Sequence, residues 1–97
     1  MIRLLRVRGQ SLTPQIEDGD FVLALKFPIF FSIRAGELIL FRKAPYGVLI
    51  KRVEAVDEQG RVFWVRGNHP DSIDSRTFGV VRDREVLGKI VARLSKS

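Results

Sequence analysis

The chain has 97 residues, no cysteine, and 17 Lys and Arg against 11 Asp and Glu, so its formal net charge is +6. This length suits one domain with a modest core, and the lack of cysteine excludes disulfides and thiolate metal sites. No stretch reaches the ~18 consecutive apolar residues of a spanning helix, and Arg3, Arg6 and Arg8 interrupt any export-signal core. We therefore expect one soluble, cytoplasmic domain over residues 1–97, whose dispersed positive charge leaves its partner undecided.

Short runs of Val, Ile, Leu and Phe alternate with Gly, Pro, Asp and Asn, which is typical of β-strands joined by tight turns. The turn Glu58-Gln59-Gly60 joins two strong strand candidates and predicts a hairpin. Only Ser11–Glu17 suits a helical turn, with Pro14 placed early, where a missing N–H costs least. The predicted fold class is mainly β, with coiled antiparallel sheets forming a partly open barrel or sandwich. The predicted strands are Ile2–Arg8, Asp20–Lys26, Glu37–Lys43, Val48–Asp57, Arg61–Arg66 and Val86–Leu94.

The first segment with chemical potential follows the first predicted strand, where Gly9 and Gln10 lead into Ser11 and a turn containing Pro14. A strand-to-turn corner can project a hydroxyl, and unpaired backbone N–H groups at the start of the turn can hold an oxyanion. Gly9 lets a peptide approach closely because it has no side chain. Taken alone, the segment fits a helix N-cap serine better than a nucleophile.

The segment Phe27-Pro28-Ile29-Phe30-Phe31 lies between two strand candidates, and Pro28 interrupts strand pairing there. One interpretation is that the aromatic side chains close one end of a small core. The other is an apolar tip, formed by Phe27, Ile29, Phe30 and Phe31 between Lys26 and Arg34, that makes peripheral contact with an anionic membrane.

Period-two alternation over Val48–Asp57 places Lys51 on one face with Leu49, Val53 and Ala55. Burial among apolar groups lowers the pKa of a lysine, and the neutral amine can then take a proton from a serine hydroxyl. The alternative is a lysine that extends its ammonium to solvent along an apolar strand.

A polar loop from Gly67 to Gly79 contains two serines, two acids and an arginine. Asp74 and Arg76 are placed to pair and fix the loop, and Ser72 to orient a neutral lysine amine. His69, the sole histidine, offers a triad with Ser11 and Asp71 or Asp74, which we rank below a Ser–Lys dyad. The alternative is an ordinary solvated surface loop without a catalytic role.

Taken in order, Gly9–Pro14, Asp18–Val22, Ile50–Val53 and Gly67–Gly79 resemble the conserved boxes of the signal peptidase I family and the related self-cleaving SOS-response repressors. The resemblance covers nearly the whole chain and is closest to minimal soluble members. It departs from the usual pattern at Leu12, where Met is common, and at Asn68-His69, where Asp-Asn is common.

The resemblance implies a mainly β serine endopeptidase without a cofactor or metal, in which Ser11 is the nucleophile and Lys51 the general base. It implies supporting roles for Ser72, which would position the lysine amine, for Asp74 and Arg76, which would brace the site, and for Gly9 and Gln10, which precede the nucleophile. The substrate would be a protein precursor bound in extended form. Maturation of a metalloenzyme precursor, such as that of nickel superoxide dismutase, is one activity that the resemblance implies.

Two other functions stay open at this stage. The charge of +6, with Trp64 or Phe63 exposed, would suit a basic β-module that binds nucleic acid or an acidic protein. We do not expect nucleic acid as a partner, because no row of aromatic residues follows one basic face. The altered Asn68-His69 segment would also suit a protein that keeps the peptidase fold without its activity.

Overall fold

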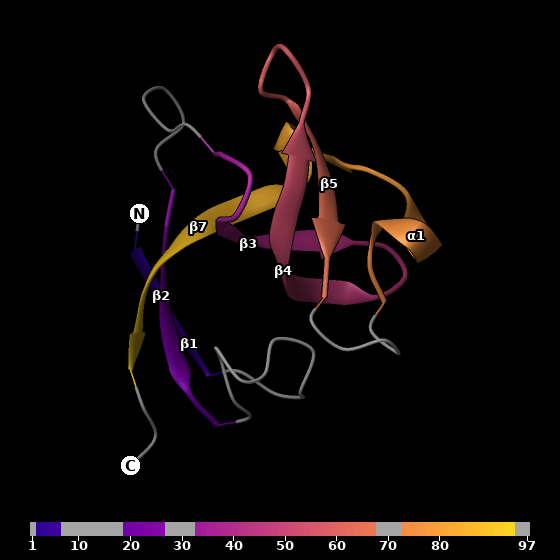
Figure 1. Ribbon diagram of the computed structural model, residues 1–97. Coiled ribbons are helices and arrows are strands. Elements are labelled where there is room, and N and C mark those ends of the chain that lie inside the picture. The colour runs from indigo at the N-terminus through magenta and orange to yellow at the C-terminus, as the bar shows by residue number, and fades with distance from the viewer. Residues whose placement is uncertain (1, 7–18, 27–32, 68–72, 95–97) are drawn as a thin grey trace.

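The computed structural model describes residues 2–6, 19–26, 33–67 and 73–94, and Figure 1 shows their arrangement. The strands in this part of the chain form one seven-stranded sheet in the order β1-β2-β7-β3-β4-β5-β6. Every pairing is antiparallel, and the sheet stays open because its end strands, β1 and β6, do not pair with each other. The strands are β1 (Ile2–Arg6), β2 (Phe21–Leu25), β3 (Leu38–Lys43), β4 (Gly47–Val56), β5 (Val62–Arg66), β6 (Val81–Arg82) and β7 (Val86–Leu94).

The mainly β prediction is confirmed, and six of the seven strands coincide with predicted ones. The predicted hairpin is present, since β4 and β5 pair across the turn and Gly60 adopts a φ of 70°, a conformation that glycine allows without strain. β6 escaped prediction because two residues are too short for an alternating pattern.

The prediction that only Ser11–Glu17 suits a helical turn is wrong. A one-turn helix, α1 (Ser75–Phe78), lies in the segment interpreted as an irregular loop, and a 3-10 turn, η1 (Asp83–Glu85), precedes β7. α1 forms because Asp74 caps it: the carboxylate accepts a hydrogen bond from the backbone N–H of Arg76. Ser11–Glu17 itself lies outside the described residues.

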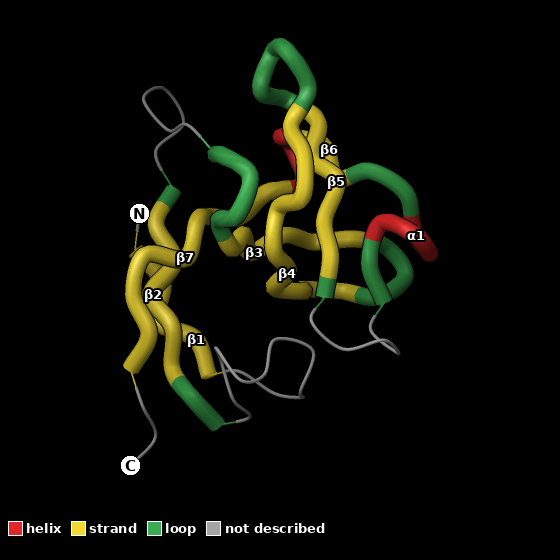
Figure 2. The backbone as a smooth tube through the Cα atoms, in the orientation of Figure 1, coloured by secondary structure: helices red, strands yellow, loops and turns green. Residues whose placement is uncertain are grey.

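Two apolar clusters lie on opposite faces of the sheet, since the neighbouring residues Leu38 and Ile39 of β3 belong to different clusters. The sheet is coiled, and Figure 2 shows β1 and β2 apart from β4 and β5. The larger cluster gathers side chains from β3, β4, β5, β6 and β7, with Phe78 of α1 packed edge-on against Phe41 at 5.9 Å between ring centroids. Its buried members are Ile39, Phe41, Val53, Phe63, Val65, Val81 and Val86. The smaller cluster surrounds Val22 with Leu5, Leu38, Ile50 and Ile90.

A β-bulge in β4 changes which side chains face the core. Val53 pairs with Val65, but the next pair is Ala55 with Trp64, so Glu54 is an extra residue in β4. The alternation predicted for this strand holds for Lys51 and Val53, which are both buried. It is wrong for Ala55, which is exposed because the bulge reverses the facing of the residues that follow it.

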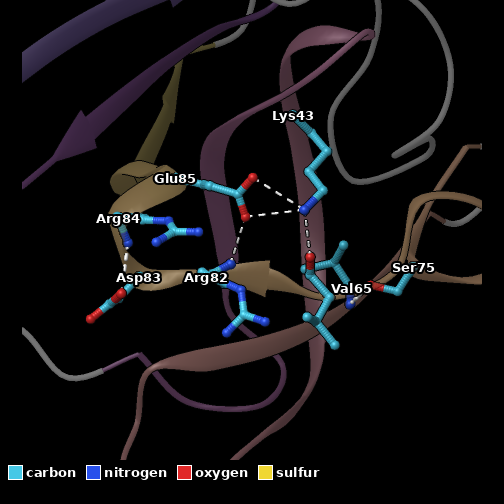
Figure 3. Close-up of polar contacts among 8 residues, drawn as sticks. Lys43, Val65, Ser75, Arg82, Asp83, Arg84 and Glu85 are labelled. Carbon is cyan, nitrogen blue, oxygen red and sulfur yellow. Dashed lines mark hydrogen bonds and ion pairs between the residues drawn. The ribbon is translucent and has the colours of Figure 1, made fainter.

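Lys43 joins the end of β3 to η1, as Figure 3 shows. Its amine donates to both carboxylate oxygens of Glu85 at 3.1 Å and to the backbone carbonyl of Val80 at 2.7 Å. Glu85 also accepts from the backbone N–H of Arg82, which closes the 3-10 turn. Three polar bonds thus satisfy a largely buried lysine away from the predicted site.

In the part of the chain that the structure describes, no helix is long and apolar enough to cross a membrane. Phe27, Ile29, Phe30 and Phe31 lie outside that part, so both interpretations of their segment remain predictions.

Candidate functional site

Lys51 lies in the middle of β4 and is buried, with 3% of its surface exposed. It is directly opposite Ile39 of β3 in the ladder and shares its face with Leu49 and Val53, which belong to or pack against the larger cluster. The apolar surroundings expected from the sequence pattern are therefore present. A lysine of this burial is uncommon unless its amine is paired or neutral.

The environment of Lys51 favours a neutral amine. Burial lowers the pKa of its ammonium below the ordinary value of 10.5, and the nearby negative charge of Asp74 opposes that shift in part. Among the described residues, the Lys51 amine forms no hydrogen bond and no ion pair. Any hydrogen-bond partner of the Lys51 amine therefore comes from outside the described part of the chain.

The other partly buried lysines on these strands are satisfied differently. Lys43 is bound by Glu85 and Val80, and the Lys89 amine lies 2.6 Å from a carboxylate oxygen of Glu37. Lys89 also sits opposite Ile39, so it and Lys51 flank the same residue on the same face. Pairing with carboxylates gives these two lysines a structural role, whereas Lys51 has no such partner in the described part of the chain.

Asp74 forms the polar centre beside Lys51, and its side chain is fully buried. Oδ1 accepts from the backbone N–H of Arg76 at 3.0 Å and from its Nε at 2.9 Å. Oδ2 accepts from Nη2 of Arg76 at 2.8 Å and from the backbone N–H of Gly67 at 3.3 Å. These bonds, led by those from the Arg76 side chain, lower the pKa of Asp74 to about 2, so the carboxylate stays charged.

A second bond ties the same segment to the sheet. The hydroxyl of Ser75 accepts a hydrogen bond of 2.8 Å from the backbone N–H of Val65 in β5, as Figure 3 shows. Together with the bond from Gly67 to Asp74, it joins the end of β5 to the start of α1. Ser75 is a functional position that the sequence pattern did not indicate, because its partner Val65 lies on a separate strand.

The Asp18-Gly19-Asp20 box ends in a buried carboxylate. Asp20 is 3% exposed, and its Oδ2 lies 4.0 Å from Nη1 of Arg93 in β7. Gly19 precedes it with a φ of 93°, which favours glycine. Asp20 thus joins the start of β2 to β7.

The structure brings together three of the predicted site residues, namely Lys51, Asp74 and Arg76. Gly9, Gln10, Ser11 and Ser72 lie outside the described residues, as does His69, so their proposed roles stay predictions. In the described ranges, no cluster of three or more His, Asp or Glu side chains is arranged to hold a metal ion.

Of the two aromatic residues considered for a nucleic-acid module, Trp64 is exposed and Phe63 is not. Phe63 is 2% exposed and belongs to the larger cluster, whereas Trp64 is 42% exposed. The two differ because adjacent residues of a strand point to opposite faces. A single exposed indole remains on this part of the sheet.

Neither a search of protein-family models nor a search of curated proteins gives a match to this chain. The arrangement is therefore interpreted from its own chemistry: a buried amine with a lowered pKa, an ionised carboxylate close by, and an arginine that fixes the carboxylate.

Proposed function

We propose that this protein is a serine endopeptidase in which Lys51 is the general base and Ser11 the nucleophile. The observation that carries the proposal is the buried Lys51 amine, which has no partner among the described residues. A purely structural lysine at such a position would be expected to bind a carboxylate or carbonyl, as Lys43 does. An unpaired amine of lowered pKa suits a group that accepts a proton.

In the proposed reaction, the neutral Lys51 amine takes the proton of the Ser11 hydroxyl while the hydroxyl oxygen attacks a peptide carbonyl carbon. The ammonium then gives that proton to the leaving amine, the C–N bond breaks, and an acyl-enzyme forms. Water attacks the ester with Lys51 again as base, which releases the acid and restores Ser11. Lys51 passes the proton taken from water to Ser11 Oγ, so both residues end in their starting protonation states without a metal or cofactor.

Asp74 has a defined electrostatic part in this scheme. Lys51 is neutral at the start and positive in the transition state, and the nearby negative charge of Asp74 stabilises the positive form. Arg76 and Gly67 hold that carboxylate in place and keep it ionised. Asp74 is thus a positioning and electrostatic residue that acts through Lys51, and Ser72 is proposed to orient the lysine amine.

The sheet also offers a place for an extended substrate. β4 pairs with β5 only from Arg52 onward, so the edge of β4 from Gly47 to Ile50 that faces away from β3 has no strand partner among the described residues. Unpaired N–H and C=O groups of a strand edge can bind a peptide as an added strand. Lys51 directly follows this edge, which would bring a bound peptide bond close to the base.

An acylating serine-reactive probe, followed by intact-mass and peptide mapping, tests the proposal. We expect a mass addition at Ser11 in the wild-type chain and none in Ser11→Ala or Lys51→Met. Lys43→Met is the matched control, because it removes a lysine that the structure pairs with Glu85. Absence of labelling from neutral to alkaline pH would show a fold without the activity, and labelling of Lys51→Met at the wild-type rate would remove Lys51 as the base.

A further inference from the structure

The outer surface of β4 and β5, opposite the face of Lys51, contains an unusual pairing of like charges. Arg52 and Arg66 are directly opposite each other in the ladder, so their side chains leave the same face of the sheet. Like charges at directly opposed positions destabilise a strand pair. The Arg52–Arg66 pair therefore lowers the stability of the fold, and neither side chain belongs to the apolar core.

The partners of these arginines leave positive charge on the surface. Arg52 donates one hydrogen bond of 2.9 Å to the carbonyl of Gly36, and no carboxylate lies within ion-pair distance of it in the described residues. Arg66 lies 3.2 Å from Glu54 through Nε, and both side chains are about half exposed. Such an exposed pair is weak, and the other guanidinium donors of Arg66 remain accessible.

An open hollow of about 440 Å³ lies beside Arg66. Trp64 and Ala55 form its apolar surface, Arg66 and Glu54 lie on the β-strand side, and Arg76 comes from α1. The Arg76 side chain uses Nε and Nη2 to hold Asp74, and Nη1 has no hydrogen bond to another described residue. Two guanidinium groups, those of Arg66 and Arg76, therefore border a hollow with one exposed indole, and Arg52 lies beside it as the ladder partner of Arg66.

We propose that this surface, formed by Arg52, Arg66, Arg76 and Trp64, docks an acidic segment of the protein substrate. Guanidinium groups bind carboxylates through paired N–H donors, and the indole offers apolar contact to a side chain between the acids. This proposal rests on the proposed peptidase function in one respect only, namely that the bound protein is a substrate. The surface lies on the other side of β4 from Lys51, and Arg76 joins it to the candidate site, because the same side chain holds Asp74 beside Lys51.

Glu54 favours a polypeptide over a nucleic acid at this surface. Glu54 lines the hollow, and its carboxylate repels phosphates and peptide carboxylates alike, but a phosphodiester backbone has no donor to offer it. A polypeptide can donate a backbone N–H to the same carboxylate. A single exposed aromatic residue also gives no platform for successive bases, since Phe63 is buried.

Fluorescence anisotropy with a labelled peptide that has glutamates on both sides of one leucine tests the docking surface. Ser11→Ala is used as the background, so that binding is measured independently of cleavage. The double variant Arg52→Gln/Arg66→Gln should bind at least about tenfold more weakly than the background protein. The matched control, Arg61→Gln/Arg84→Gln, removes the same charge from exposed positions elsewhere and should lose less than about threefold.

Three outcomes would overturn the docking proposal: no binding of the acidic peptide at low salt, equal losses in the two double variants, or equal binding when glutamine replaces every glutamate. Tighter binding of a single-stranded oligonucleotide, with the same loss in Arg52→Gln/Arg66→Gln, would assign the surface to nucleic acid instead. Thermal melting of each variant verifies folding, and Trp64→Ala gives an independent test, since it should weaken binding without changing net charge. The binding assay does not depend on Ser11, so a negative result there leaves the peptidase proposal intact. A negative result in the labelling of Ser11 likewise leaves the docking proposal intact.

Discussion

The buried carboxylate of Asp74 binds the half-exposed guanidinium of Arg76 through two hydrogen bonds, Nε to Oδ1 at 2.9 Å and Nη2 to Oδ2 at 2.8 Å. The same carboxylate caps α1 and accepts from the backbone of Gly67. One side chain thus fixes the helix, the end of β5 and the charge beside Lys51.

Asp74→Asn should lower the free energy of unfolding by about 2 kcal/mol at neutral pH, in line with a folded-state pKa of about 2 against an ordinary 3.8. A carboxyl whose pKa is lowered on folding stabilises the protein above its unfolded pKa. That stability is lost as the pH falls through the folded value. The difference between wild type and variant in urea unfolding should therefore be full above about pH 4 and shrink toward pH 2. A constant difference across this range would contradict the assignment.

Lys51→Met should abolish peptidase activity without lowering thermal stability. Methionine is similar in length and apolar, so it suits the face shared with Leu49 and Val53 and removes a buried amine that has no described partner. Lys43→Met is the opposite case, because it leaves Glu85 and the Val80 carbonyl without their donor and should cost about 1–3 kcal/mol. Melting temperatures and turnover of a peptide substrate separate the two. Equal destabilisation by both changes would mean that Lys51 is paired after all.

Peptidase activity should rise with pH and reach half its maximum below pH 10.5, the ordinary pKa of a lysine, because burial lowers the pKa of Lys51 and only the neutral amine accepts a proton. The same shift makes the folded state bind fewer protons than the unfolded one between the two pKa values. The free-energy cost that Lys51 imposes on folding therefore becomes smaller as the pH rises from the folded pKa toward the ordinary, unfolded pKa. A pH profile of kcat/KM measures the first effect. An inflection that disappears in His69→Ala but persists in Lys51→Met would instead indicate the histidine triad.

Ser72→Ala and Ser75→Ala should differ in what they change. Ser75 accepts the hydrogen bond of the Val65 N–H, so its loss should cost about 1 kcal/mol of stability and leave kcat nearly unchanged. Ser72 is proposed to orient the Lys51 amine, so Ser72→Ala should lower kcat with little effect on stability. Urea unfolding and steady-state kinetics on both variants check this. The reverse pattern would exchange the roles of the two serines.

Local patterns were sufficient to predict the strands and the surroundings of Lys51. Short apolar runs bounded by turn residues identified β1, β2, β3, β4, β5 and β7, and a period of two gave the facing of residues in the first part of β4. Gly60 marked the hairpin because its turn needs a positive φ. The facing of Lys51 followed from the alternation with Leu49 and Val53 beside it, but only the structure decided that the lysine is buried and does not extend to solvent.

Tertiary structure alone decided the features that depend on partners distant in the sequence. The insertion of β7 between β2 and β3, and the bulge that exposes Ala55, are properties of strand pairing and have no local signature. α1 is too short to be stable alone, and it forms because Asp74 and Ser75 find partners at Arg76 and on β5. The facing of Arg52 and Arg66 likewise arises from the register between two strands. Sequence by itself determined where the strands run and which neighbours Lys51 has on its face, because these depend on local patterns, whereas contacts between separate segments determined where the bulge falls and which charges meet.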